Sequence, residues 1–295
     1  MRSAEPGFSA AQAAGIRAAL QPGPVQVIAV TGGKGGVGKT CVAVNLAAAL
    51  ATKRRVLLLD GDLGLANADV QLGLVPGHTL EHVLDGRCTL EEAVVDTPLG
   101  FRLIAGASGV ARLAGLSTAE HLGLVQAFSH LTQGLDTLII DTAAGIADSV
   151  LQFCQASQHV LVVVNDEPAS LTDAYALIKV LHRTHGMRRF HVLANRATGA
   201  GSGELLFRKL ERVTSRFLDV LLEYAGEIPD DALVRSAIRA QRCVVDAYPS
   251  SSASRAFARL AARAARWSTP GSRGNVEFFI ERLLPRATPR LEAVR

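Results

Sequence analysis

Cysteine is scarce in this chain and is not arranged in pairs. The four cysteines are Cys41, Cys88, Cys154 and Cys243, and they show neither a Cys-x-x-Cys pair nor a Cys/His spacing. Zinc and iron–sulfur sites use such pairs, and secreted miniproteins use many cysteines. The pattern therefore argues against a zinc site, an iron–sulfur cluster and a disulfide framework, and we expect a protein of the reducing cytosol.

Long apolar runs and strong net charge are also missing. No apolar stretch reaches the ~18 residues that a membrane-spanning helix needs, and the N-terminus, MRSAEPGFSAAQ, lacks the apolar core of a secretory signal. We therefore expect the protein to stay inside the cell. The net charge of +4 is mild, with arginines scattered through the second half, so charge alone does not predict nucleic-acid binding. Binding to an acidic partner or to an anionic lipid surface stays an alternative.

Short apolar runs recur between helix-like segments. Amphipathic stretches at 170–184 and 203–222 are two of these segments. The apolar runs span 25–30, 55–60, 101–106, 135–141, 159–165 and 190–195. Each run is continuously apolar, which is typical of parallel strands buried on both faces. The sequence predicts an α/β fold with a mostly parallel sheet, flanked by helices on both faces, that binds ligands beyond the carboxyl ends of its strands.

Residues 33–40, GKGGVGKT, fit the phosphate-binding P-loop motif between a predicted strand and a predicted helix. Its glycines allow backbone N–H groups to face an anion, to which the helix beginning near Lys39 adds its positive end. Lys39 is expected to hold the β- and γ-phosphates of ATP, and Thr40 to bind Mg²⁺ through its hydroxyl. The predicted nucleotide-binding residues of the loop are Gly33, Lys34, Gly35, Gly36, Val37, Gly38, Lys39, Thr40 and Cys41.

Lys34 is a second cation in this loop, although the whole chain has only five lysines. Since Lys39 already serves the nucleotide of its own subunit, Lys34 suggests a phosphate group that comes from outside the subunit. The pattern resembles the deviant Walker A motif of the MinD/ParA superfamily of P-loop NTPases, whose signature lysine reaches the partner's nucleotide. The resemblance implies an ATP-dependent homodimer in which Lys34 acts in trans.

Two carboxylates, Asp60 and Asp62, lie at the end of the second predicted strand, where they can hold the magnesium shell and orient the attacking water. The superfamily resemblance implies that Asp62 positions the water and Asp60 belongs to the magnesium shell. The family usually has Asp-Ala-Asp, and we expect Gly61 to add backbone freedom. Asp141 ends another apolar run and, with the TAAG turn, resembles Walker B and switch II. The predicted catalytic residues are Asp62, Lys34 and Lys39, and the predicted magnesium ligands are Thr40, Asp60 and Asp141.

The adenine site is predicted from the same resemblance. Asn195 resembles the asparagine that reads adenine, and residues 226–231, GEIPDD, resemble the loop that closes over the base. Asn195, Pro229 and Asp230 are the base contacts that this implies.

Four segments resemble the FleN/FlhG branch, the MinD-like ATPases that control flagellar number. They are residues 60–74, 141–146, 162–181 and 240–261. The resemblance extends from about residue 25 to 284. It implies a slow ATPase switch that restrains flagellar synthesis by opposing the master regulator FleQ and works with the GTPase FlhF at the cell pole.

Both ends of the chain add expectations. Residues 1–23 are expected to form an activator-like helix and linker, residues 24–268 the ATPase domain, and residues 269–295 a linker and an amphipathic helix. AAQAAGIR, at 10–17, resembles the activator motif of the branch, so Gln12 would stimulate FlhF and Arg17 would support docking. An ordinary N-terminal helix is the alternative.

The C-terminal helix has one apolar face and is too short to be stable alone in water. A groove on its own domain or a membrane interface would bury that face. The resemblance suggests docking without ATP and release in the dimer, so peripheral contact with the cell membrane is expected. The face comprises Val276, Phe278, Phe279, Ile280, Leu283 and Leu284.

Other functions stay open. Arg255, Arg259, Arg263 and Arg266 share one helical face, which is either a solvated surface or a DNA contact as in ParA relatives. No direct specific DNA binding is expected. The alternatives are a ParA-type DNA-partitioning ATPase, a MinD-type division-positioning ATPase and a non-enzymatic regulator that ATP locks. Nitrogenase-type reductases share the loop but need paired cluster cysteines, and no cysteine follows switch II in their position.

Overall fold

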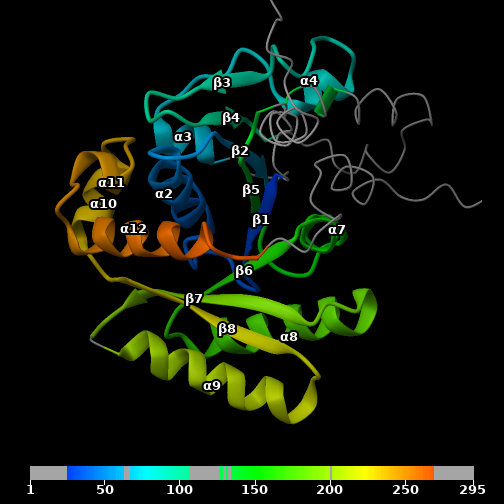
Figure 1. The fold of residues 1–295 in the computed structure, drawn as a ribbon, viewed down its shortest axis with the longest axis vertical. Helices are drawn as coiled ribbons and strands as arrows, with labels where there is room; N and C mark the ends of the chain where they lie inside the picture. Colours follow the sequence, from blue (N-terminus) through cyan, green and yellow to red (C-terminus); the bar gives the residue numbers. More distant parts are fainter. Residues whose placement is uncertain are drawn as a thin grey trace, which may run out of the picture.

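The computed structural model describes residues 25–62, 67–106, 127–128, 131, 134–199 and 201–268. Its centre is an eight-stranded sheet in the order β3-β4-β2-β5-β1-β6-β7-β8 (Figure 1). All neighbouring strands are parallel except β3 and β4, which pair antiparallel at one edge. The predicted α/β class with a mostly parallel sheet is confirmed.

The strands are β1 (Gln26–Thr31), β2 (Val56–Gly61), β3 (Val94–Asp96), β4 (Arg102–Ile104), β5 (Thr137–Thr142), β6 (His159–Val164), β7 (Arg189–Ala197) and β8 (Leu221–Pro229). The helices are α2 (Lys39–Ala51), α3 (Ala68–Leu72), α4 (Leu80–Leu84), α7 (Asp148–Ala156), α8 (Pro168–His185), α9 (Ser202–Phe217), α10 (Ala232–Arg239), α11 (Val244–Ala247) and α12 (Ser252–Ala264).

Helices cover both faces of the sheet. Successive residues of a strand point to opposite faces, so alternate residues of β1 belong to different cores. Ile28 and Val30 of β1 belong to a core with α2, α11 and α12. Val27 packs in a core with α4 and α7, and Ala29 in a core with α7, α8 and α9. Figure 1 shows α12 beside α2, and α9 below β7 and β8. Continuous burial of the central strands explains why their sequences are continuously apolar.

Six strands lie where the apolar runs predicted them, but β3 and β8 were not predicted. The helical stretch predicted over 203–222 was too long: α9 ends at Phe217, Leu218 is extended, and β8 starts at Leu221. Residues 226–229, predicted as part of a loop, are the end of β8. β8 is an edge strand with partly exposed positions, so it lacks the continuous apolarity of the central strands.

Several predictions fall outside the described residues. They include the N-terminal helix with Gln12 and Arg17, and the C-terminal helix with Val276, Phe278, Phe279, Ile280, Leu283 and Leu284. Within the described part of the chain, no helix combines the length and apolarity that crossing a membrane requires.

Candidate nucleotide-binding site

The P-loop joins β1 to α2 at the carboxyl edge of the sheet. Gly36 and Gly38 have φ angles of +78° and +96°, a left-handed backbone that side chains disfavour. Gly33 lies against α8, where a Cβ atom would come within 2.2 Å of the Asp173 carbonyl oxygen. Glycine is therefore required at Gly36 and Gly38 for a left-handed backbone, and at Gly33 for the close approach of the loop to α8. The loop leads directly into the positive N-terminal end of α2.

Lys39 begins α2, and only 8% of its surface is exposed. Burial lowers the pKa of its ammonium group, while attraction to Asp141 and then Asp62 opposes this shift. Lys39, Asp141 and Asp62 are therefore close enough to interact electrostatically. A cation placed here can bind phosphate oxygens.

Asp60 holds the chain that follows β2. Its Oδ1 accepts a hydrogen bond from the Asp62 backbone N–H at 3.0 Å, and its Oδ2 accepts from the backbone N–H groups of Asn67 and Ala68, both at 3.0 Å. Burial raises the pKa of this carboxyl group against these hydrogen bonds. The contact with Asp62 is an Asx turn, which is the alternative to a magnesium role for one of the two aspartates. The contacts with Asn67 and Ala68 were not predicted.

We had expected Gly61 to add backbone freedom, but the structure places it in a regular strand. It continues β2 and pairs with Thr142 of β5. A Cβ atom at this position would lie 2.9 Å from Cε2 of Phe153 and 3.0 Å from the Asp141 carbonyl oxygen. Close packing therefore explains the glycine at this position.

Asp141 lies opposite Asp60 in the β2–β5 pairing and is almost fully buried. Neither of its carboxylate oxygens has a partner with hydrogen-bond geometry among the described residues, although Thr40 and Lys39 lie near enough to favour the charged form. Burial, followed by the charge of Asp60, raises the pKa of Asp141 to about 8. An unpartnered buried carboxylate is costly unless a cation completes it.

The residues present fit a magnesium–nucleotide complex. Asp141 has free acceptor oxygens, and Thr40 contributes a hydroxyl beside it. Across the described ranges, no three histidine, cysteine or acidic side chains form a group that could hold a metal ion by themselves. Mg²⁺ is usually held by one or two carboxylates together with phosphate oxygens and water, and the Asp141 carboxylate and the Thr40 hydroxyl can supply the protein's share of these ligands.

Lys34 is the second residue of the P-loop motif 33–40. It forms an ion pair with Glu167, which lies directly before α8. The other oxygen of Glu167 accepts a hydrogen bond from Asn165 Nδ2 at 2.7 Å. Both charged side chains are partly exposed, at 38% for Lys34 and 48% for Glu167. The ion pair places the ammonium group of Lys34 on its own subunit, and Glu167 was missed because no local pattern links it to the loop.

The predicted adenine residues line one cavity of about 290 Å³ beside the P-loop. Asn195, Pro229 and Asp230 lie there with Gly38 and Cys41. Asn195 Nδ2 also donates a hydrogen bond to the Val37 carbonyl oxygen at 2.7 Å, which ties the end of β7 to the loop. Ile228 and Asp231, from the predicted segment 226–231, also line the cavity. Sequence reasoning missed the other lining residues: Arg196, Val234, Arg235, Ile238 and Phe257.

Arg196 has a left-handed backbone, with φ of +57°, at a register shift between β7 and β8. Such bulges redirect a side chain and are frequent beside functional sites. No local pattern signals this position, because the bulge depends on the pairing with β8.

The proposed arginine row is partly engaged with the protein itself. Arg263 Nη1 donates to the Tyr224 carbonyl oxygen at 2.8 Å, and Arg266 Nε to the Ala262 carbonyl oxygen at 3.2 Å. Arg255 also donates to a backbone carbonyl oxygen, that of Ser250. These contacts support the reading of the row as an ordinary surface.

Known proteins are similar to this chain in sequence and in architecture. The CobQ/CobB/MinD/ParA nucleotide binding domain matches residues 28–243. The antiactivator FleN of Pseudomonas aeruginosa is 57% identical over 263 residues, which cover 88% of this chain and 94% of that protein. The flagellum site-determining protein YlxH of Helicobacter pylori is 32% identical over 241 residues, covering 81% of each chain.

Solved structures agree with this assignment. The cell division ATPase MinD of Pyrococcus furiosus matches with a TM-score of 0.66 and 26% identity, covering 82% of this chain and 99% of that chain. MinD of Pyrococcus horikoshii, complexed with Mg-ADP, matches with a TM-score of 0.64 and 26% identity, covering 80% and 94%. With its P-loop, strand-end carboxylates and these likenesses, the chain belongs to the CobQ/CobB/MinD/ParA family of nucleotide-binding domains, in its FleN/FlhG branch.

Proposed function

We propose that this protein is an ATP-dependent, dimerising ATPase switch that regulates flagellar number. The observation that carries the proposal is the buried carboxylate of Asp141, which lacks a hydrogen-bond partner among the described residues and lies beside Lys39 and Thr40 of the P-loop. The identity to the antiactivator FleN and the likeness to YlxH support the flagellar role.

The residues of the site have distinct tasks in this proposal. Mg²⁺, when bound with ATP, neutralises phosphate charge and orients the phosphates. Lys39 binds the β- and γ-phosphates, and Thr40 and Asp141 bind Mg²⁺ directly. Asp60 belongs to the outer magnesium shell, because its oxygens already accept three backbone hydrogen bonds. Asp62 orients the attacking water. The base contacts Asn195, Pro229 and Asp230, while Lys34 leaves Glu167 and binds the nucleotide of the second subunit.

Partners and location extend the proposal. The dimer opposes the transcriptional regulator FleQ and works with the GTPase FlhF, which Gln12 and Arg17 engage. Residues 1–23 act as the activator segment, residues 24–268 as the ATPase domain and residues 269–295 as the docking or membrane segment. The protein then acts in the cytoplasm, on the inner face of the cell membrane or at the pole.

Size-exclusion chromatography with light scattering tests the switch. The wild-type chain is loaded with Mg-ADP or with a nonhydrolysable ATP analogue and Mg²⁺, beside Lys34→Ala and the exposed control Lys53→Ala. We expect a dimer only with the analogue for wild type and Lys53→Ala, and a monomer in both states for Lys34→Ala. A wild-type chain that stays monomeric with saturating analogue contradicts the proposal.

Hydrolysis needs its own test, because Lys34→Ala removes both the dimer and its turnover. Asp62→Ala should bind the ATP analogue and dimerise like wild type while phosphate release falls by at least about a hundredfold. Loss of ATP binding in this variant would show that Asp62 has another role. ATP-dependent, salt-sensitive binding of nonspecific DNA by the wild type would instead favour a ParA-type partitioning protein.

A further inference from the structure

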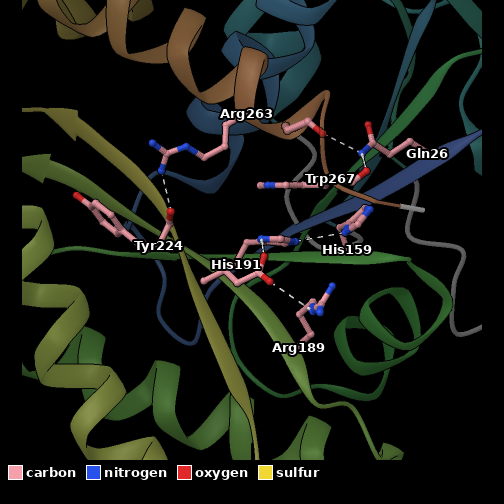
Figure 2. Close-up of polar contacts among 9 residues, drawn as sticks. Gln26, His159, Arg189, His191, Tyr224, Arg263 and Trp267 are labelled. Atoms are coloured by element: carbon pink, nitrogen blue, oxygen red, sulfur yellow. Dashed lines mark hydrogen bonds and ion pairs between the residues drawn. The ribbon is translucent and has the colours of Figure 1, made fainter. Parts of the chain in front are cut away.

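A buried histidine pair lies beneath the only tryptophan of the chain (Figure 2). Trp267 follows α12 and stacks on His191 of β7, with ring centroids 3.7 Å apart and planes 8° from parallel. The ring of His159, at the start of β6, lies 5.4 Å from the Trp267 ring. We call these three residues the histidine–tryptophan cluster. His159 and His191 lie near the amino-terminal ends of their strands, opposite the P-loop edge of the sheet.

The two imidazoles fit together as neutral rings. His191 Nε2 lies 3.3 Å from His159 Nδ1, so a single proton between these two nitrogens makes a hydrogen bond. His159 Nε2 is buried and has no hydrogen-bond partner among the described residues. The two residues are almost fully buried, with 5% of His159 and 2% of His191 exposed. An additional proton would therefore place a cation where water is excluded.

The charged groups around the pair act on such a cation in opposite directions: the Glu223 carboxylate would favour it and the Arg189 guanidinium would oppose it. Glu223 of β8 places Oε2 3.1 Å from His191 Nδ1, without hydrogen-bond alignment, and its Oε1 pairs with Arg189 Nε at 3.4 Å. Burial, then the charges of His159 and Arg189, lowers the pKa of His191 to about 3. Burial and Arg189 lower the pKa of His159 to about 4. The face of Trp267 and the Glu223 carboxylate would attract an imidazolium, whereas burial, the largest cause of both pKa shifts, disfavours it.

Two side chains, Gln26 and Arg54, hold the backbone that leads to Trp267. Gln26 begins β1 and Arg54 lies just before β2, so both are at the amino-terminal ends of the parallel strands. Gln26 Nε2 donates to the Ala264 carbonyl oxygen at 2.9 Å. Arg54 Nη2 donates to the Ala265 carbonyl oxygen at 2.7 Å and Arg54 Nη1 to Gln26 Oε1 at 2.9 Å. These contacts hold the end of α12, while the ring of Trp267 is held by the histidines. Trp267 is thus the last side chain with such contacts before residues 269–295 follow in the sequence.

We propose that the histidine–tryptophan cluster is a proton-sensitive latch at the root of residues 269–295, closed when both imidazoles are neutral and opened when the pair takes up a proton. Lifting Trp267 from His191 admits water to the pair. The open form therefore binds a proton with an ordinary histidine pKa of about 6.5, whereas the closed form does not. The closed form is favoured above that pH and loses its advantage as the pH falls.

One proton taken up on opening raises the open-to-closed ratio about tenfold between about pH 7.5 and about pH 5.5. Because Trp267 is the only tryptophan, fluorescence of the full chain reads the latch directly. We expect acrylamide quenching to increase and the emission maximum to shift to longer wavelength over this range, while far-ultraviolet circular dichroism stays constant.

Matched variants separate the latch from general acid effects. His191→Phe keeps a ring under Trp267 without a titrating nitrogen, so its quenching should not depend on pH, and the exposed control His78→Gln should behave like wild type. His191→Gln serves the same purpose if His191→Phe does not fold. Wild-type quenching that is independent of pH overturns the latch. An unchanged pH dependence in the folded His191 variant overturns it equally.

Discussion

Asp60 and Asp141 occupy paired positions on the neighbouring strands β2 and β5, but their carboxylates have opposite environments. Asp60 accepts three backbone hydrogen bonds, whereas neither oxygen of Asp141 has a hydrogen-bond partner among the described residues. Two equivalent positions on adjacent strands thus divide the work: one carboxylate organises the following loop, and the other is left for a ligand.

Replacing each aspartate by asparagine should therefore change stability in opposite directions. At about pH 8.5, Asp141→Asn should raise the free energy of unfolding of the nucleotide-free protein by about 1–3 kcal/mol, because a buried charge is removed. Asp60→Asn should lower it by about 1–3 kcal/mol, because charged hydrogen bonds are lost. Urea denaturation without nucleotide measures both, and destabilisation of similar size in the two variants would contradict the contrast.

The pH dependence of nucleotide binding should follow Asp141. Because its pKa is raised to about 8, the free protein holds a proton there that magnesium ligation must displace. Affinity for Mg-ADP should increase as the pH rises, by up to about tenfold per pH unit, and level off above about pH 8. In the same range, the stability of the free protein should fall as the pH rises, because its folded state holds the extra proton.

Calorimetry of Mg-ADP binding at several pH values measures this linkage. Asp141→Asn gives the baseline, since the nucleotide phosphates titrate identically in both experiments. If wild type and Asp141→Asn show the same pH dependence, Asp141 does not ligate magnesium.

The hydrogen bond between Asn195 and the Val37 carbonyl oxygen should couple the base pocket to the P-loop. Asn195→Ala leaves a buried carbonyl oxygen without its donor, which should cost about 1–3 kcal/mol of stability. We also expect the affinity for ADP to fall about tenfold, which corresponds to a loss of about 1.4 kcal/mol of binding free energy.

Arg235→Gln is the matched control for Asn195→Ala. Arg235 lines the same cavity but forms a surface ion pair with Asp230, at 2.8 Å, so its loss should change stability by less than about 1 kcal/mol. Thermal denaturation and ADP titration compare the two variants. Equal effects would show that the cavity as a whole, and not the contact with Val37, is sensitive.

Gly61→Ala should destabilise the protein although alanine is usual here in the family. The new methyl group would crowd Phe153 and the Asp141 backbone, with an expected cost of about 1–3 kcal/mol. Gly77→Ala, at a site with open space, should change stability by less than about 0.5 kcal/mol. Adding Phe153→Leu to Gly61→Ala should recover part of the lost stability. If the double variant instead loses the sum of the two single losses, the effect of Gly61→Ala does not come from a clash with Phe153.

Where the sequence predicted the fold well, the signal was local. The six apolar runs correspond to six of the seven strands that pair in parallel, namely β1, β2, β4, β5, β6 and β7. β8 was missed because an edge strand is buried on fewer positions, and its first residues continue the amphipathic pattern of α9. Pairing with β7, which no local pattern records, decides where α9 ends and β8 begins.

The sequence by itself determined the chemistry available at the nucleotide edge. A P-loop motif specifies its own backbone, and a residue that ends a parallel strand must lie at the carboxyl edge of the sheet, so Lys39, Asp60 and Asp141 could be placed from local pattern alone.

The tertiary structure decided how these groups are completed. The strand order brings together segments that are distant in the chain, so it pairs Lys34 with Glu167, Asn195 with Val37 and His191 with Trp267. Hydrogen bonds and burial depend on those neighbours in space, which is why the unpartnered carboxylate of Asp141 and the buried histidine pair could not be read from residue order.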